Sequence, residues 1–596
     1  MPGLHAYGIN ARCNAENFMW GVTMLRYLIT SSLAALALTA CSQPANAPAT
    51  DEQSEAAPAE TQASSAYPAH QASDAAINEA DFAYRISALA DDRFEGRGPA
   101  SEHGEQAATW IAEEMDAVGL EPAGTDGWFQ PVPLIESTLD ESASSFDITV
   151  DGEAMGLQTN VDVVFWSQNP EEQVSLDASE LVFVGYGVVA PEYGWNDYEG
   201  VDVTGKTVVI LINDPGFADP DAGWFNGSAM TYYGRWTYKY EEAARQGAEG
   251  AIIVHQTAPA AYPWGTVQSS WTGPQFTLAS SAGQERADVQ AWITEDKAVE
   301  LFSALDLDFA ELSEAAVSPD FTPVDMGRAT MSASLTNSLR TLTSNNVAGQ
   351  VEGSERPDEY VLFMAHWDHI GVRLNFSGDD QIYNGAIDNA TGVTAMLELA
   401  EAYAKSDTPP ERSVIFVAVT AEEQGLLGSE YYAQNPLVPL DQTVGGFNFD
   451  GILPIGRTED IVVIGYGASE LEDLLRAEAE ADGMYLSPDP NPEAGYFYRS
   501  DHVTLARRGV PMLYADSGSV AEEGGAEYGA QIEAAYRLQA YHKPADEFDP
   551  NWDMGGFVQS TELVYRVSRR LTDSEDWPNW YEDNEFRAIR DAMMDD

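Results

Sequence analysis

The chain has 596 residues, which is too long for one hydrophobic core of ordinary size, so two or three domains are expected. Its charge is strongly asymmetric: 97 acidic residues stand against 29 lysines and arginines, giving a formal net charge of -68 at pH 7. Such a chain repels phosphate, so we expect no nucleic-acid partner and interpret the charge as a heavily hydrated, soluble surface. Two cysteines, Cys13 and Cys41, exclude a disulfide framework.

The first 79 residues are predicted to lie outside the folded body. From Met24 the chain carries one arginine, a short apolar stretch and small residues before Cys41. Residues 38–41 resemble the bacterial lipoprotein signal, in which the cysteine is lipidated; an ordinary secretory signal is the alternative. We therefore assign residues 1–41 to an upstream extension and signal, and the Ala-, Pro- and Ser-rich residues 42–79 to a disordered tether.

This interpretation predicts where the protein resides. We expect the bacterial cell envelope, in the periplasm or as an outer-membrane lipoprotein, or secretion. A lipid at Cys41 would be the only attachment to a membrane, because no other stretch of the sequence has the length and apolar character of a membrane span.

Folded structure is predicted from residue 80. Residues 80–175 contain an amphipathic helix, whose apolar side chains recur at helical spacing from Ala108 to Val118 and which Gly119 ends. Residues 176–315 contain several apolar runs typical of strands. The last run is 250–255, and a helical pattern precedes it. This change predicts a small mixed α/β domain.

The remaining residues, 316–596, alternate strand and helix patterns. Predicted helices lie at 390–405 and 469–483, and alternation of this kind indicates an α/β fold with a mostly parallel central sheet and helices on both faces. In such sheets, sites gather at the carboxyl ends of the strands. The predicted strands are 346–351, 360–365, 413–419, 446–448, 461–464 and 510–514.

Ionisable residues follow several of these strands. His366 and Asp368 come directly after the apolar run 360–365, although such a pair alone is more often a local hydrogen bond than a site. Further ionisable candidates lie at positions like that of His366, near the ends of other predicted strands or before a predicted helix, and they are Asp388, Glu422, Glu423, Asp450 and His542. Because one zinc takes about three protein ligands, a set of this size favours two ions, about 3.5–4 Å apart, that share a carboxylate.

The neighbouring carboxylates Glu422 and Glu423 need different roles. They repel each other unless a cation neutralises one of them, so one can bind a metal while the other accepts a proton from water. This is an arrangement of one ligand and one base.

Five segments, in this order, resemble the secreted co-catalytic di-zinc aminopeptidases: HWD, GAIDNATG, TAEEQGLLGS, NFDG and YHKPAD. The wider metallopeptidase family includes glutamate carboxypeptidases, glutaminyl cyclases and the transferrin receptor. The segment LADDRFEGR resembles the family's N-terminal part, and GKTVVIL with YEEAARQGAEGAIIVH resembles an inserted protease-associated domain. The resemblance implies peptidase parts at 80–175 and 316–596 and a protease-associated domain at 176–315.

The resemblance also implies a role for each candidate ligand. Asp388 would bridge two zinc ions, with His366 and Asp450 binding one ion and Glu423 and His542 the other. Other divalent metals could replace zinc.

Further roles follow from the same resemblance. Glu422 would be the general base and Asp368 would orient His366, whereas His369 receives no role and is predicted to be structural. A cis peptide bond is expected between Asp388 and Asn389.

The segment YRSDH matches a part of the family that lines the substrate pocket. Arg499, Asp501 and His502 are therefore candidate pocket residues. The alternative is a helix start capped by Ser500 or Asp501.

The predicted function is hydrolysis of N-terminal peptide bonds by a di-zinc-bound water, with peptides bearing a free N-terminus as substrates. An acidic site suits a free α-amino group, whereas a carboxypeptidase would need an arginine cluster, and only Arg373 and Arg499 lie near the motifs. Carboxypeptidase and single-zinc glutaminyl cyclase activity remain the alternatives on the same fold. A non-enzymatic binding module is disfavoured because all five ligands are present. The oligomeric state stays open.

Overall fold

The computed structural model describes residues 75–281, 286–373, 378, 380–515, 517–582 and 584–595. The predicted signal with Cys41, and most of the predicted tether, lie outside these residues. Within the described ranges no helix has both the length and the apolar composition needed to cross a membrane.

The first of two large sheets contains four parallel strands from the second half of the chain, β14, β17, β18 and β21. β13 joins β17 in antiparallel orientation, and β2 and β11 extend this edge. The predicted α/β fold with a mostly parallel central sheet is therefore confirmed. The strands, in spatial order, are β11 (Pro274–Leu278), β2 (Phe129–Leu139), β13 (Val324–Val351), β17 (Arg412–Val419), β14 (Arg356–His366), β18 (Thr443–Phe449) and β21 (Met512–Tyr514).

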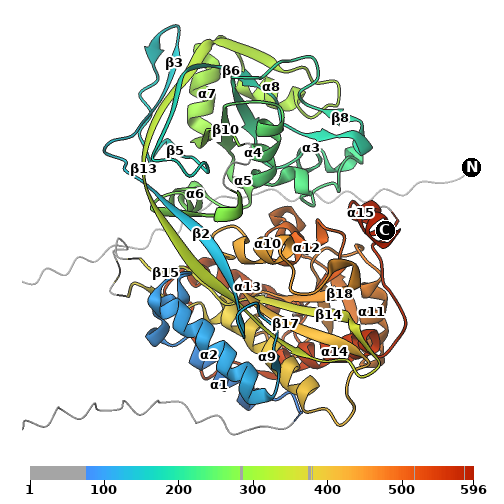
Figure 1. The fold of residues 1–596 in the computed structure, drawn as a ribbon. Helices are drawn as coiled ribbons and strands as arrows, with labels where there is room; N and C mark the ends of the chain where they lie inside the picture. Colours follow the sequence, from blue (N-terminus) through green and yellow to red (C-terminus); the bar gives the residue numbers. More distant parts are fainter. Residues whose placement is uncertain are drawn as a thin grey trace, which may run out of the picture. The chain divides into compact units, whose positions relative to one another are not determined.

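Helices cover both faces of this sheet (Figure 1). Phe363 of β14 belongs to a buried cluster that includes residues of α1, α2, α9, α11 and α14, whereas its neighbours Leu362 and Met364 belong to a second cluster with residues of α10 and α12. Burial on both faces explains why the β14 sequence is an unbroken apolar run. These helices are α1 (Glu79–Leu89), α2 (Glu102–Val118), α9 (Gly392–Ala404), α10 (Leu427–Gln434), α11 (Leu471–Ala481), α12 (His502–Ala506) and α14 (Gly555–Thr572).

Residues 140–323, which we call the inserted unit, build most of a second sheet. Its strands β6, β9, β10 and β12 are parallel, and β5 closes one edge in antiparallel orientation. The first half of β13 pairs with β3 and β6, and its second half continues into the first sheet (Figure 1). The strands are β3 (Ser145–Val150), β5 (Val163–Trp166), β6 (Gln173–Phe183), β9 (Thr207–Leu211), β10 (Gly250–His255) and β12 (Val289–Thr294).

The inserted unit also has helices on both faces of its sheet. α4 (Trp236–Arg245) and α6 (Trp264–Ser270) share one core with the sheet, and α7 (Glu295–Ala304) and α8 (Phe309–Ala315) share another. The predicted mixed α/β character of this region agrees with these layers.

The sheets divide the chain differently from the predicted boundary at residue 176. β3 and β5 precede this residue but pair within the second sheet, whereas β11 follows it but pairs with β2 of the first sheet. Short strands carry little information about their partners, because pairing depends on tertiary packing.

Arg97 fixes the N-terminal segment to the loops that follow β14. Its side chain is 1% exposed and donates to the carbonyl oxygens of Trp367 at 2.7 Å, Leu89 at 3.0 Å and Gly385 at 2.8 Å, and also to that of Asn384. One buried guanidinium thus satisfies backbone acceptors from three separate segments.

Replacing Arg97 with alanine should lower the free energy of unfolding by about 3–5 kcal/mol, because several buried carbonyl groups lose their donor. Urea denaturation followed by circular dichroism measures this loss. The control is Arg93→Ala, since Arg93 is exposed on the same turn and should cost about 0.5 kcal/mol or less. Equal stability of the two variants would contradict the role assigned to Arg97.

Candidate active site

Strand register brings three of the predicted site segments to one edge of the first sheet. His366 is the last residue of β14 and lies beside Val419 of β17, and Ala365 lies beside Phe449 of β18. The residues that follow β17 and β18, including Glu422, Glu423 and Asp450, therefore emerge next to His366.

Asp388 reaches the same edge from a wide helical turn, η6 (Ala386–Thr391), that precedes α9. The peptide bond between Asp388 and Asn389 is cis, as the family resemblance implies. The Asn389 amide donates to the carbonyl oxygen of Phe449 at 2.9 Å, and its own oxygen accepts from the Gly451 N–H at 3.1 Å. Asn389 thus ties the turn to the end of β18.

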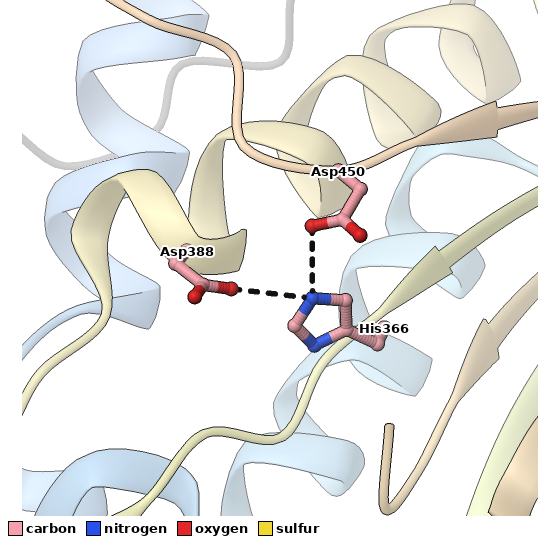
Figure 2. Close-up of side chains that lie close together, drawn as sticks. All are labelled: His366, Asp388 and Asp450. Carbon is pink, nitrogen blue, oxygen red and sulfur yellow. Dashed lines mark hydrogen bonds and ion pairs between the residues drawn. The ribbon is translucent and has the colours of Figure 1, made fainter. Parts of the chain in front are cut away.

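His366, Asp388 and Asp450 form the first group of candidate ligands (Figure 2). The Nε2 atom of His366 lies 3.3 Å from Asp388 Oδ1 and 3.2 Å from Asp450 Oδ1. All three ligand atoms point to one place, as the sequence predicts for these residues.

The second group uses the other oxygen of the same aspartate. His542 Nε2 lies 3.2 Å from Asp388 Oδ2 and 3.3 Å from Glu423 Oε2. Each oxygen of Asp388 therefore faces one histidine, and each histidine faces one further carboxylate.

His369 also belongs to this second group, so the prediction that it is only structural does not describe its position. Its Nδ1 lies 2.6 Å from Glu423 Oε1, so Glu423 contacts one histidine through each of its oxygens. His369, Asp388 and Glu423 together have the spacing of a possible metal site. The second histidine of the HWDH segment was the available signal in the sequence.

Asp368 contacts His366 mainly through its backbone carbonyl oxygen. The Nδ1 atom of His366 lies 3.1 Å from the Asp368 carbonyl oxygen and 3.9 Å from the Asp368 carboxylate. That carboxylate instead accepts the backbone N–H of Glu422 at 3.0 Å. Asp368 therefore fixes the loop of the two glutamates as well as the imidazole.

Asp546 supports the backbone of the Asp388 turn. Its side chain is 1% exposed and accepts the N–H groups of Ile387 at 2.9 Å and Asp388 at 3.1 Å. Burial raises the pKa of Asp546 to about 6, although these two hydrogen bonds oppose the shift. Asp546 is the last residue of the YHKPAD segment, but no role was predicted for it, because its backbone partners lie far away in the sequence.

The charges around these groups are unbalanced. Burial, followed by repulsion from Asp450 and Glu423, raises the pKa of Glu422 well above its ordinary value, although His366 opposes the shift. Burial also acts on Asp388, but hydrogen bonds from His366 and His542 outweigh it and hold the pKa of Asp388 well below its ordinary value.

The donor set fits a divalent cation. Burial lowers the pKa of His366, but the carboxylates of Glu422 and Asp450 outweigh it, and the pKa lies well above the ordinary value. The surrounding carboxylates thus favour a positive charge at this place, and a cation bound between the same atoms would supply it. Imidazole nitrogens with carboxylate oxygens are ligands that zinc accepts.

The candidate residues line a cavity of about 850 Å³. Asp388, Glu422, Glu423, Asp450 and His542 all contribute to its wall, so four of the five predicted ligands and the predicted base face one space, whereas His366 is buried behind them at 1% exposure.

The predicted pocket segment is only partly on this wall. Arg499 lines the cavity, but Asp501 and His502 do not, and both side chains are 0% exposed. The alternative of a capped helix start is not observed either, since α12 begins without a side-chain cap. Ser500 accepts a hydrogen bond from the Asn448 amide at 2.7 Å instead.

Two cavity residues were not recognised from the sequence. Tyr541 stacks on His542 with ring centroids 4.0 Å apart, and its hydroxyl lies 3.5 Å from Arg499 Nη2. Arg235, from the inserted unit, also lines the cavity. The position of Tyr541 beside the histidine was visible in the sequence, whereas that of Arg235 depends on packing between distant segments.

Comparison with known proteins places this site in a family. Residues 346–566 match the model of peptidase family M28, a range that contains His366, Asp388, Glu422, Glu423, Asp450 and His542. This match confirms the resemblance that the sequence motifs indicated.

Relatives with names agree with this assignment over short ranges. The chain is 39% identical over 89 residues to a probable zinc metalloprotease of Pyrenophora teres f. teres, covering 15% of this chain and 18% of that protein. It is 33% identical over 122 residues to the aminopeptidase NAALADL1 of Mus musculus, covering 20% and 15%. The chain thus spans less than a fifth of the length of these relatives.

Solved structures are similar over most of the chain. An aminopeptidase from Aneurinibacillus sp. strain AM-1 has a TM-score of 0.49 at 18% identity, covering 84% of this chain and 95% of that one. BSAP, a zinc aminopeptidase from Bacillus subtilis, has a TM-score of 0.40 at 18% identity, covering 84% and 98%. The match to the family model thus shows that residues 346–566, which contain the site, are similar to peptidase family M28.

Proposed function

We propose that this chain is a di-zinc aminopeptidase that removes the N-terminal residue of peptides. The observation that carries the proposal is the position of Asp388, whose two oxygens each face a histidine that also faces a second carboxylate. His366 and Asp450 would hold one ion, Glu423 and His542 the other, with Asp388 shared. Two zinc ions bound there would polarise the scissile carbonyl and lower the pKa of a water molecule.

Glu422 is the proposed general base. It lines the cavity beside the ligand carboxylates, and Asp368 holds its backbone through a 3.0 Å hydrogen bond. Since Glu423 is occupied by two histidines, Glu422 is the glutamate of this pair that is left to accept a proton from the attacking water. It would then pass that proton to the leaving amine.

Arg499 and Tyr541 are proposed to stabilise the substrate carbonyl. Both line the cavity, and the guanidinium and the hydroxyl lie 3.5 Å apart, so both can donate to one developing oxyanion. Neither residue is needed to hold a metal.

An aminopeptidase and a carboxypeptidase differ in which end of the peptide binds near the metals. The carboxylates Glu422 and Asp450 on the cavity wall suit the ammonium group of a free N-terminus. Arg235 and Arg499 on the same wall favour a second candidate, a carboxypeptidase, because guanidinium groups bind carboxylates. We favour the aminopeptidase because these two carboxylates lie at the proposed metal site itself.

Replacing Glu422 with glutamine should lower kcat by about 10²–10⁴-fold, because the amide cannot accept the proton from water. Bound zinc, measured by atomic absorption, should stay unchanged. Glu430→Gln is the matched control, since Glu430 lines the same cavity but pairs with Arg508 at 2.7 Å. Retained turnover in the Glu422 variant would remove this residue from the proposed role.

The shared position of Asp388 predicts different metal losses for two aspartate variants. After dialysis against a weak chelator, Asp388→Asn should lose zinc from both positions, whereas Asp450→Asn should keep about one ion per chain. The number of ions per chain is the measurement. Equal losses of zinc in the two variants would contradict a shared bridging ligand. A single zinc ion in the unmodified protein would also contradict it and would favour the glutaminyl cyclase alternative.

Blocking one end of the substrate tests the direction of attack. Leucinamide and Leu-Gly-Gly should be hydrolysed, whereas their N-acetyl derivatives should be inert, because the acetyl group removes the ammonium charge. Release of free leucine is the measurement. Hydrolysis of N-acetyl peptides from the carboxyl end would instead establish the carboxypeptidase.

A further inference from the structure

The inserted unit forms part of the wall of the catalytic cavity. Tyr232, Arg235, Trp236, Tyr262 and Trp271 all line the same cavity as the proposed metal ligands. Burial, followed by repulsion from Arg499, lowers the pKa of Arg235 to about 10, while Glu422 opposes the shift, so Arg235 lies within electrostatic range of the proposed base. The unit therefore contributes directly to the space where a substrate binds.

Several contacts hold this wall against the M28 domain. The N–H of Met230 donates to the carbonyl oxygen of Pro492 at 3.1 Å. Arg507 lies over the ring of Tyr232 at 4.7 Å and forms an ion pair with Glu241 at 3.6 Å. These contacts fix the beginning of α4, where Trp236 stands, relative to the cavity.

Trp236 and Trp271 form an aromatic corner that remains partly exposed to the cavity. Trp271 stacks face to face on the buried Trp166, with centroids 3.6 Å apart, and meets Trp236 edge to face at 4.9 Å. The ring of Trp166 is 4% exposed and backs the corner from inside the unit. The two accessible rings thus have fixed positions before any ligand binds.

We propose that Trp236 and Trp271 are a subsite for an apolar or aromatic side chain in the leaving part of the peptide. This inference rests on the proposed aminopeptidase activity. An aminopeptidase holds only one residue on the amino side of the scissile bond, yet the cavity of about 850 Å³ lies near the upper end of the range for ligand pockets. The remaining space belongs to residues that follow that bond.

The subsite predicts a preference among tripeptides. Leu-Phe-Gly or Leu-Gly-Phe should have a higher kcat/KM than Leu-Gly-Gly, because the phenylalanine ring packs against the two indoles, and an aromatic contact of this kind is worth roughly tenfold. Leucinamide, whose leaving group is ammonia, cannot reach the corner and serves as the reference substrate.

The experiment compares Trp236→Ala, Trp271→Ala and the control Trp264→Ala. Trp264 is also partly buried and packs on the same core of the inserted unit, but it does not line the cavity. In the first two variants, we expect kcat/KM for the preferred phenylalanine peptide to fall about tenfold while leucinamide stays within twofold. Trp264→Ala should leave the ratio of these two substrates unchanged.

Two results would overturn the subsite. One is an unchanged preference for phenylalanine peptides in both cavity variants. The other is an equal fall in kcat/KM for leucinamide and the tripeptide, which would mean that the two indoles contact the first residue of the substrate. Should Trp271→Ala misfold by circular dichroism, Trp236→Ala carries the test alone. Failure of the unmodified enzyme on leucinamide and all tripeptides would instead refute the proposed function, so the two failures are distinguishable.

Discussion

The site depends on one shared carboxylate. Asp388 presents one oxygen to His366 and the other to His542, at 3.3 and 3.2 Å, so a single side chain sets the geometry of both ligand groups. A displacement of this aspartate would disturb both groups at once, which is why its backbone needs stronger support than that of a surface loop. The structure provides this support from three directions.

Buried polar side chains supply that support. Asn389 ties the turn to the end of β18, Asp546 accepts two of its N–H groups, and Arg97 donates to the carbonyl oxygens that precede it. Each of these groups would be costly to bury alone, and each is satisfied by backbone from a distant segment. The ligands are thus positioned by hydrogen bonds as much as by the strands that precede them.

Much of the fold and the proposed ligand set could be predicted from the sequence, because both leave local signals. The apolar run before His366 and the helical spacing of residues 390–405 indicated an α/β sheet, and the order of the motifs indicated its family. By contrast, His369 and Asp546 lie in or beside recognised segments, but only the fold brings them to their partners Glu423 and Ile387. The contact of the His366 ring with the Asp368 carbonyl oxygen likewise depends on three-dimensional structure.

The inserted unit shows the same limit at the level of domains. Its strands were recognisable, but β13 spans both sheets and β11 leaves the unit to pair with β2, and neither pairing has a local signature. For the same reason, Trp236 and Trp271 carried no functional signal until the fold brought them to the wall of the cavity. The most direct test of the account is a zinc-edge anomalous diffraction map of the purified protein. A two-zinc site predicts two peaks in this map, about 3.5–4 Å apart, with Asp388 between them. A single peak, or peaks away from Asp388, would contradict the two-zinc site.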